Sequence, residues 1–139
     1  GDALWLCPKG VRVGMGCRRG TPAVALRTLL EDVLTQEGIP EKAVCALCTI
    51  DLKKDEPGLQ ELAREWNVPL LTYSAQELAQ VPGNFTPSPF VEQVTGVDNV
   101  CERAALASGG TLLRKKMAKD GATVALAMEE LHLTWKEHL

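Results

Sequence analysis

The stretch Val11–Thr21 reads VRVGMGCRRGT, and it sets the expected fold. Its first three residues have the short apolar pattern of a strand, and a glycine-rich turn follows them. Thr21 can cap a helix with its hydroxyl, Pro22 suits the first helical position, and Gly38 is placed to end that helix. Between them, apolar residues recur at helical spacing: Leu26, Leu29, Leu30, Val33 and Leu34. The stretch therefore predicts a strand, a glycine turn and a helix.

The same alternation repeats further along the chain. The run VCALCTI at Val44–Ile50 is typical of a strand buried on both faces, and a charged loop follows it. A helix over 59–66 and a strand, LLTY, at 70–73 are expected next. Ser74 and Glu77 have the spacing of a capping box and predict a short helix. Strands that alternate with helices predict a parallel sheet with helices on both faces.

The last third of the chain departs from this alternation. We expect a helical turn over 88–96, then a helix over 99–108 that Asp98 caps. Thr111–Met117 and Thr123–Met128 are predicted to be strands, and the Asp-Gly dipeptide between them is a strong hairpin signal. An antiparallel hairpin is therefore expected beside the parallel strands.

These elements predict an α/β fold class: a three-layer α/β/α arrangement with a mixed, mainly parallel sheet of about five strands. Residues 11–128 are expected to form one domain. Residues 1–10 are interpreted as an N-terminal extension or linker remnant, and 129–139 as a C-terminal helical tail.

Composition narrows the classes of function. The 139 residues carry a net charge of −3, which argues against general nucleic-acid binding. No apolar segment is long enough to span a membrane, which needs about 20 residues. Five cysteines without regular spacing indicate reduced thiols and a cytoplasmic protein. We expect no metal and no cofactor, because zinc ligands are too few and the glycine spacing does not fit a dinucleotide motif.

Basic residues follow the predicted strands, where ligands bind in open parallel sheets. They are Arg18, Arg19, Lys53 and Lys54, with Arg114, Lys115, Lys116 and Lys119 on or beside the hairpin. Most acidic residues lie instead on predicted helices. A chain that is acidic in total is therefore expected to have a local basic cleft for an anionic ligand.

The glycine-rich segment is the main candidate for ligand binding. Glycines allow the backbone to approach a ligand, a helix N-terminus favours anions, and paired arginines match carboxylates. The candidate residues are Gly14, Gly16, Cys17, Arg18, Arg19, Gly20 and Thr21. The alternative is a tight turn with two solvated arginines. Cys17 sits where a thiol pKa is lowered, but no histidine is near to act as its base.

The loop 51–56 holds three carboxylates and two lysines. Asp51 or Glu56 is a candidate general base, and Lys53 or Arg18 a candidate for stabilising an oxyanion. Asp55 is a further candidate ligand contact. The alternative is that Asp51 and Asp55 cap the loop and the next helix.

Four motifs together resemble the CbiG C-terminal domain and CobE family of cobalamin biosynthesis. They are GMGCRRGT at 14–21, TIDLKKDEPGL at 49–59, VCERAAL at 100–106 and TVALA at 123–127. In order, they cover about residues 11–128. The resemblance adds Glu102 and Lys115 to the expected ligand contacts.

The resemblance implies a carboxylate-rich tetrapyrrole ligand, a cobalt-precorrin or precorrin intermediate. It implies one of two roles for the chain. The chain is either the C-terminal domain of a cobalt-precorrin-5A hydrolase, which opens a lactone and releases acetaldehyde, or a non-catalytic CobE-like carrier. Whether the chain is an enzyme stays open on this reading. Other cobalamin-pathway enzymes are expected partners. Binding of some other carboxylate or phosphate is the third alternative.

Overall fold

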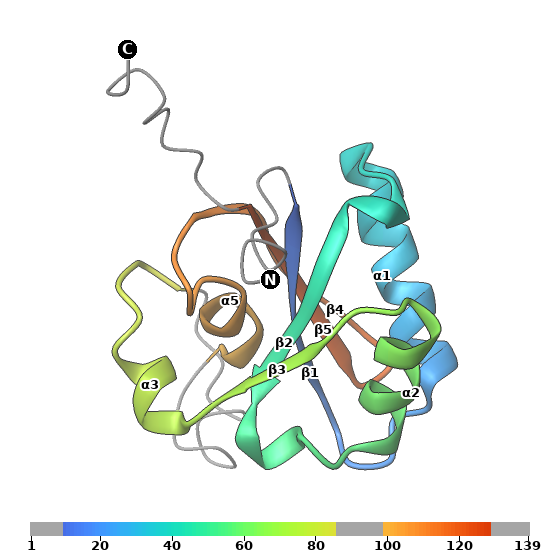
Figure 1. The fold of residues 1–139 in the computed structure, drawn as a ribbon, viewed down its shortest axis with the longest axis horizontal. Coiled ribbons are helices and arrows are strands. Elements are labelled where there is room, and N and C mark those ends of the chain that lie inside the picture. Colours follow the sequence, from blue (N-terminus) through green and yellow to red (C-terminus); the bar gives the residue numbers. More distant parts are fainter. Residues whose placement is uncertain (1–9, 86–98, 129–139) are drawn as a thin grey trace.

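The computed structural model describes residues 10–85 and 99–128, which form a five-stranded sheet in the order β3-β2-β1-β5-β4 (Figure 1). The strands are β1 (Val11–Cys17), β2 (Val44–Ile50), β3 (Leu70–Tyr73), β4 (Thr111–Lys119) and β5 (Ala122–Met128). The pairs β1–β2 and β2–β3 are parallel, whereas β1–β5 and β4–β5 are antiparallel. The predicted mixed α/β sheet is confirmed, with β5 the one strand that runs against the other four.

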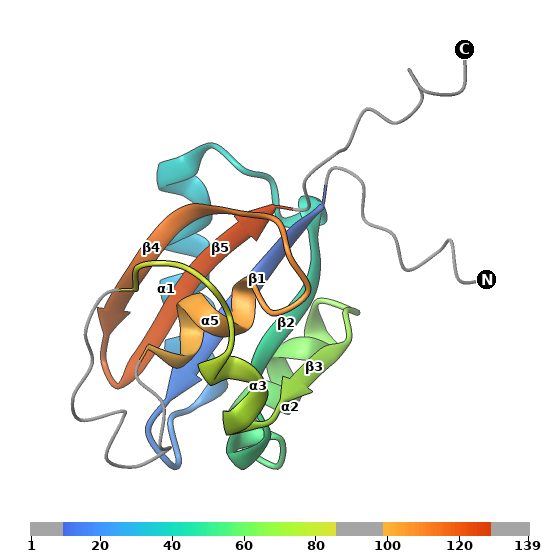
Figure 2. The same cartoon turned by 90° about the vertical axis from the view of Figure 1, so that its left-hand side faces the viewer.

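Helices cover both faces of the sheet, as predicted (Figures 1 and 2). One face carries α1 (Ala23–Glu37) and α2 (Pro57–Glu65), and the other carries α3 (Ala75–Ala79) and α5 (Val100–Ala105). The larger apolar core lies under α1 and α2, and a smaller one lies under α3 and α5. Two 3-10 turns, Glu41–Ala43 and Asp51–Lys53, flank β2.

The β4–β5 hairpin turns in two residues. Asp120 and Gly121 have φ of 52° and 84°, as a type I′ turn requires. The predicted hairpin is confirmed, with strands longer than 111–117 and 123–128 because the turn is so tight. The resulting pairing places β5, the last described strand, between β1 and β4.

The glycine turn predicted after residue 13 is wrong in its position, since β1 continues to Cys17. Gly14 lies within the strand, and α5 crosses directly above it. A Cβ on Gly14 would stand 1.8 Å from the carbonyl oxygen of Cys101 and 2.9 Å from the backbone nitrogen of Ala105. The backbone that approaches Gly14 is therefore that of α5. Gly16 lies instead against a side chain, the Thr123 hydroxyl.

Two predicted helix caps are also wrong. Pro22 occupies the N-cap of α1, and the Thr21 hydroxyl instead donates to the Arg18 carbonyl at 2.7 Å. Asn99 caps α5, because its side-chain oxygen accepts the Glu102 backbone N–H at 3.0 Å. The helix is also shorter than the predicted 99–108.

Other local predictions are confirmed. Gly38 ends α1 in the left-handed conformation with φ of 68°, and Ser74 and Glu77 form the capping box of α3. The ranges of β2 and β3 agree with the prediction. The predicted N-terminal extension, the turn over 88–96, Asp98 and the tail 129–139 lie outside the described residues, apart from Gly10. No helix within residues 10–85 and 99–128 has the length and apolarity needed to cross a bilayer.

Candidate functional site at the carboxyl edge of the sheet

Three segments meet at the edge where β1 and β2 end, at the bottom of Figure 1. The loop Arg18–Thr21 follows β1, the segment Asp51–Glu56 follows β2, and the hairpin turn at Gly121 lies beside the end of β1, because Cys17 pairs with Ala122. We call this region the carboxyl edge. It contains most of the residues predicted from the sequence to form the site.

The loop Arg18–Thr21 is held by its own backbone and by the hairpin. The Arg18 N–H donates to the Gly121 carbonyl at 2.9 Å, and the Thr21 N–H donates to the Arg18 carbonyl at 3.1 Å. Gly20 has φ of 80°, a left-handed conformation that favours glycine. The side chains of Arg18 and Arg19 are exposed on this loop. The predicted turn thus exists four residues later than Gly14–Gly16 suggested.

Glu56 joins the two loops. Its Oε2 accepts the Gly20 backbone N–H at 2.6 Å, across 36 residues of sequence. Two residues further on, Gly58 lies against the Thr21 carbonyl, and a Cβ there would be 2.4 Å from that oxygen. The loops after β1 and β2 are therefore in direct contact.

Cys17 behaves differently from the prediction. Burial raises the pKa of its thiol from 9.0 to about 11, the Glu56 carboxylate adds to the rise, and Lys53 opposes it. The expected lowering of this pKa is wrong, because the thiol is half-buried beneath a carboxylate rather than exposed at a helix N-terminus. The same interactions place Glu56 and Lys53 near Cys17.

The capping alternative for Asp51 and Asp55 is not found. The 3-10 turn Asp51–Lys53 and α2 both begin without a side-chain cap, and Glu56 rather than Asp55 is the N-cap residue of α2. Both aspartates are exposed at the carboxyl edge, beside the partly exposed Lys53. Their carboxylates are therefore accessible to a ligand there.

Glu102 and Lys115 lie away from these loops. Glu102 is only 1% exposed, and its Oε2 accepts the Lys116 backbone N–H at 2.6 Å. That N–H lies where the β4–β5 register is interrupted between Arg114 and Met117. Glu102 thus holds an irregular part of β4, while Lys115 is exposed on the same edge strand. Their contact with a ligand stays a prediction.

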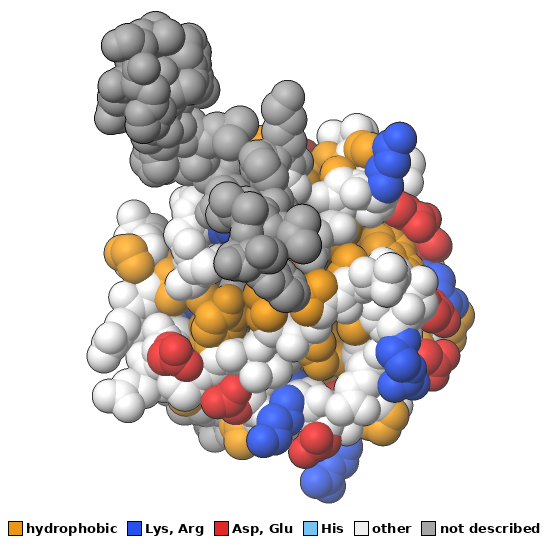
Figure 3. Space-filling view, in the orientation of Figure 1, with side chains coloured by type: hydrophobic (Ala, Val, Ile, Leu, Met, Phe, Trp, Pro, Cys, Tyr) orange, Lys and Arg blue, Asp and Glu red, His pale blue; other side chains and the backbone are white. Residues whose placement is uncertain are grey.

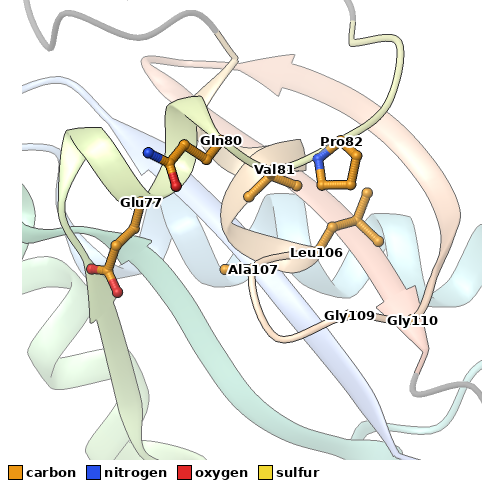
Figure 4. A pocket seen from close by; sticks show the side chains of 8 residues that line it. All are labelled: Glu77, Gln80, Val81, Pro82, Leu106, Ala107, Gly109 and Gly110. Atoms are coloured by element: carbon orange, nitrogen blue, oxygen red, sulfur yellow. The ribbon is translucent and has the colours of Figure 1, made fainter.

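A cavity of about 330 Å³ lies at a different place from the predicted site (Figure 4). It opens between the segment that leaves α3 and the segment that joins α5 to β4. Its lining consists of Glu77, Gln80, Val81, Pro82, Leu106, Ala107, Gly109 and Gly110. None of the residues predicted from the sequence to form the site lines this cavity.

Sequence reasoning missed Arg12, a buried arginine next to this cavity's lining. Arg12 is 5% exposed, and its Nε donates to the Ala105 carbonyl at 3.1 Å. Its Nη2 donates to the carbonyl of Gly109. The guanidinium thus binds the carbonyls where α5 ends, as favoured at a helix C-terminus. The available signal was a cation between two valines in an otherwise apolar strand.

The surface charge at the carboxyl edge is mixed rather than basic. Figure 3 shows Lys or Arg side chains interspersed with Asp or Glu along the lower edge of the view. No three His, Cys, Asp or Glu side chains in the described part of the chain are grouped so that they could hold a metal. Of the cations predicted to form a local basic cleft, Arg18, Arg19, Lys53 and Lys54 lie on the loops of the carboxyl edge, where they are mixed with the carboxylates of Asp51, Asp55 and Glu56.

Together, the fold and the carboxyl edge define a three-layer α/β domain. Its candidate ligand-binding residues lie on the loops that follow two parallel strands. A family model described as "Cobalamin synthesis G C-terminus" matches residues 11–127. The chain belongs to this family of CbiG C-terminal domains.

Individual relatives agree with this membership. The cobalt-precorrin-5A hydrolase of Priestia megaterium is 41% identical over 123 residues, which are 86% of this chain and 33% of the relative. The protein CobE of a Sinorhizobium species is 33% identical, over 85% of this chain and 79% of that protein. CobE, a protein from the cobalamin (vitamin B12) biosynthetic pathway, also has a crystal structure. That structure superposes on this chain with a TM-score of 0.83 at 37% sequence identity, and the match covers 88% of this chain and 92% of the CobE chain. The chain thus spans about a third of the hydrolase and most of CobE.

Proposed function

We propose that this domain binds a carboxylate-rich corrin precursor at the carboxyl edge and acts as the C-terminal part of a cobalt-precorrin-5A hydrolase. One observation carries the proposal. The segments 14–21 and 49–59, which bear the two most specific family motifs, meet at this edge through the Glu56–Gly20 hydrogen bond. Arg18 and Arg19 would bind acetate and propionate arms, because guanidinium groups match carboxylates with two parallel hydrogen bonds.

The lactone-opening step needs a base to activate water and a cation to stabilise the oxyanion. Asp51 suits the first role, because its carboxylate is exposed and caps no helix. Lys53 lies in the same segment and suits the second. Glu56 fits the role of base less well, because its Oε2 already accepts the Gly20 N–H. Opening of the lactone in the full reaction is followed by release of the two-carbon unit as acetaldehyde.

A second candidate function is a carrier that binds the tetrapyrrole without transforming it. The structural likeness to CobE favours it, since the CobE crystal structure superposes with a TM-score of 0.83 at 37% identity. In either role, contact with other cobalamin-pathway enzymes and a cytoplasmic location are parts of the proposal.

The test incubates the chain with cobalt-precorrin-5A and measures binding by absorbance and product by an acetaldehyde assay. The hydrolase proposal expects both, and the carrier proposal expects binding alone. Replacing Arg18 and Arg19 together by Ala should weaken affinity by about 3 kcal/mol, roughly 150-fold, if both meet carboxylates. Arg64→Ala, an exposed arginine in the last turn of α2, is the matched control. Unchanged affinity in the double variant would remove the carboxyl edge from the site.

A further inference from the structure

Glu56 occupies an unusual place for a residue that begins a helix. It is the N-cap residue of α2, with extended backbone angles, yet its side chain does not cap that helix. The carboxylate instead crosses to the preceding loop and accepts the Gly20 N–H at 2.6 Å. Such a short, charge-assisted hydrogen bond is stronger than one between neutral groups.

The start of α2 is fixed where this contact is made. Gly58 has no side chain, and its backbone therefore packs against the Thr21 carbonyl and the Leu26 side chain. Leu59 and Leu26 are both fully buried in the larger core. Glu56 thus extends from a closely packed helix start, which holds its carboxylate beside Gly20.

Gly20 is the part of the Arg18–Thr21 loop that the other contacts do not hold. Arg18 is bound to the hairpin through its N–H, and Thr21 is bound to the Arg18 carbonyl. Arg19 and Gly20 lie between these anchors and are exposed, and Gly20 is in the left-handed conformation. The Glu56 carboxylate is the anchor that fixes this middle part of the loop.

We propose that Glu56 is a positioning residue that holds the Arg18–Gly20 backbone in the conformation that binds the ligand. Both arginines are then presented before the ligand arrives, so that binding does not have to order the loop. The identity of the ligand rests on the proposed function above, whereas the effect on Gly20 does not. Asp51 then remains the candidate base.

Two substitutions at Glu56 separate hydrogen bonding from charge. Glu56→Gln and Glu56→Ala remove the same negative charge from an anion-binding edge, but only Gln keeps an oxygen that can accept the Gly20 N–H. If loss of this anchor leaves about a tenth of the loops in the binding conformation, the Ala variant binds about 10-fold more weakly than the Gln variant. Glu41→Gln and Glu41→Ala, at an exposed acid before β2, should differ by less than about 2-fold, since no part of the carboxyl edge depends on Glu41.

The first measurement needs no ligand. The chemical shift and the hydrogen-exchange rate of the Gly20 amide proton are measured by NMR in the parent chain and in the four variants. We expect its downfield shift and its protection to be partly kept in Glu56→Gln, because a neutral acceptor makes a weaker hydrogen bond than a carboxylate, to be lost in Glu56→Ala, and to be unaffected by either Glu41 variant. A Gly20 amide that is the same in Glu56→Ala as in the parent chain overturns the proposal.

The second measurement is the affinity for cobalt-precorrin-5A in the same four variants. Equal affinities of the Gln and Ala variants at position 56 would also overturn the positioning role. If the parent chain does not bind the precursor, the proposed function fails, and the Gly20 amide decides whether Glu56 holds the loop. The two failures are therefore distinguishable.

Discussion

Gly14→Ala tests the close approach of the α5 backbone to β1. The added Cβ would stand 1.8 Å from the Cys101 carbonyl oxygen and 2.8 Å from its carbon. Non-bonded heavy atoms prefer about 3.5 Å, so α5 would have to move away by more than about 1 Å. Neither partner in this clash is the end of a flexible side chain, and the strain must therefore spread into the helix and its core.

The expected decrease in the free energy of unfolding follows from this geometry. Overpacking typically destabilises by about 1–3 kcal/mol, and we place Gly14→Ala near 3 kcal/mol because backbone atoms are displaced. Alanine has less conformational freedom than glycine in the unfolded chain, and this difference stabilises the folded state by about 0.4–1 kcal/mol. The net loss of about 2–2.5 kcal/mol should lower Tm by roughly 10 °C for a domain of about 100 residues.

The assay is thermal and urea unfolding of Gly14→Ala beside Gly16→Ala. A Cβ on Gly16 meets only the Thr123 hydroxyl, at 2.8 Å, and that side-chain atom can shift. We expect this control to lose less than about 1 kcal/mol. The reasoning is refuted if both variants unfold at the same midpoint, or if Gly14→Ala is as stable as the parent chain.

Two further predictions concern a cap and a thiol. Ser74→Ala removes the capping box of α3 and should cost about 1 kcal/mol in urea unfolding, whereas the exposed Thr28→Ala on α1 should not destabilise. An unchanged midpoint for Ser74→Ala would show that the cap is dispensable. The thiol pKa of Cys17 is raised from 9.0 to about 11, so the unreactive neutral thiol predominates below about pH 11. At pH 8, Cys17 should therefore react with iodoacetamide about 100-fold more slowly in the folded chain than in urea. Peptide mapping measures this rate, which should rise until about pH 11; a plateau near pH 9 would contradict the raised pKa.

Much of the fold was predictable because it depends on local signals. The β-branched and apolar runs of β2 and β3, and the Asp-Gly turn of the hairpin, each specify their element within a few residues. The Gly14 segment was mistaken for a turn because its partner, α5, lies some 87 residues further along the chain. A local pattern cannot show that a glycine is needed there for packing rather than for turning.

The site was predictable in its location but not in its contacts. Parallel strands bring their carboxyl ends to one edge, so the meeting of the Arg18–Thr21 loop with the segment after β2 follows from topology. The hydrogen bond from Gly20 to Glu56 depends on the docking of α2 against α1, which the sequence does not display. The raised pKa of Cys17 and the buried position of Arg12 depend in the same way on tertiary burial.

The position of β5 has a consequence for how the domain is made. This strand is the last of the five to be synthesised, yet it lies between β1, the first, and β4. A nascent chain that ends before Ala122 can pair β1 only with β2 and leaves its other edge open, while β4 has no neighbour. Completion of the sheet must therefore wait until residue 128 has left the ribosome, and during that interval the exposed side of β1 is a place where a chaperone or another strand could bind.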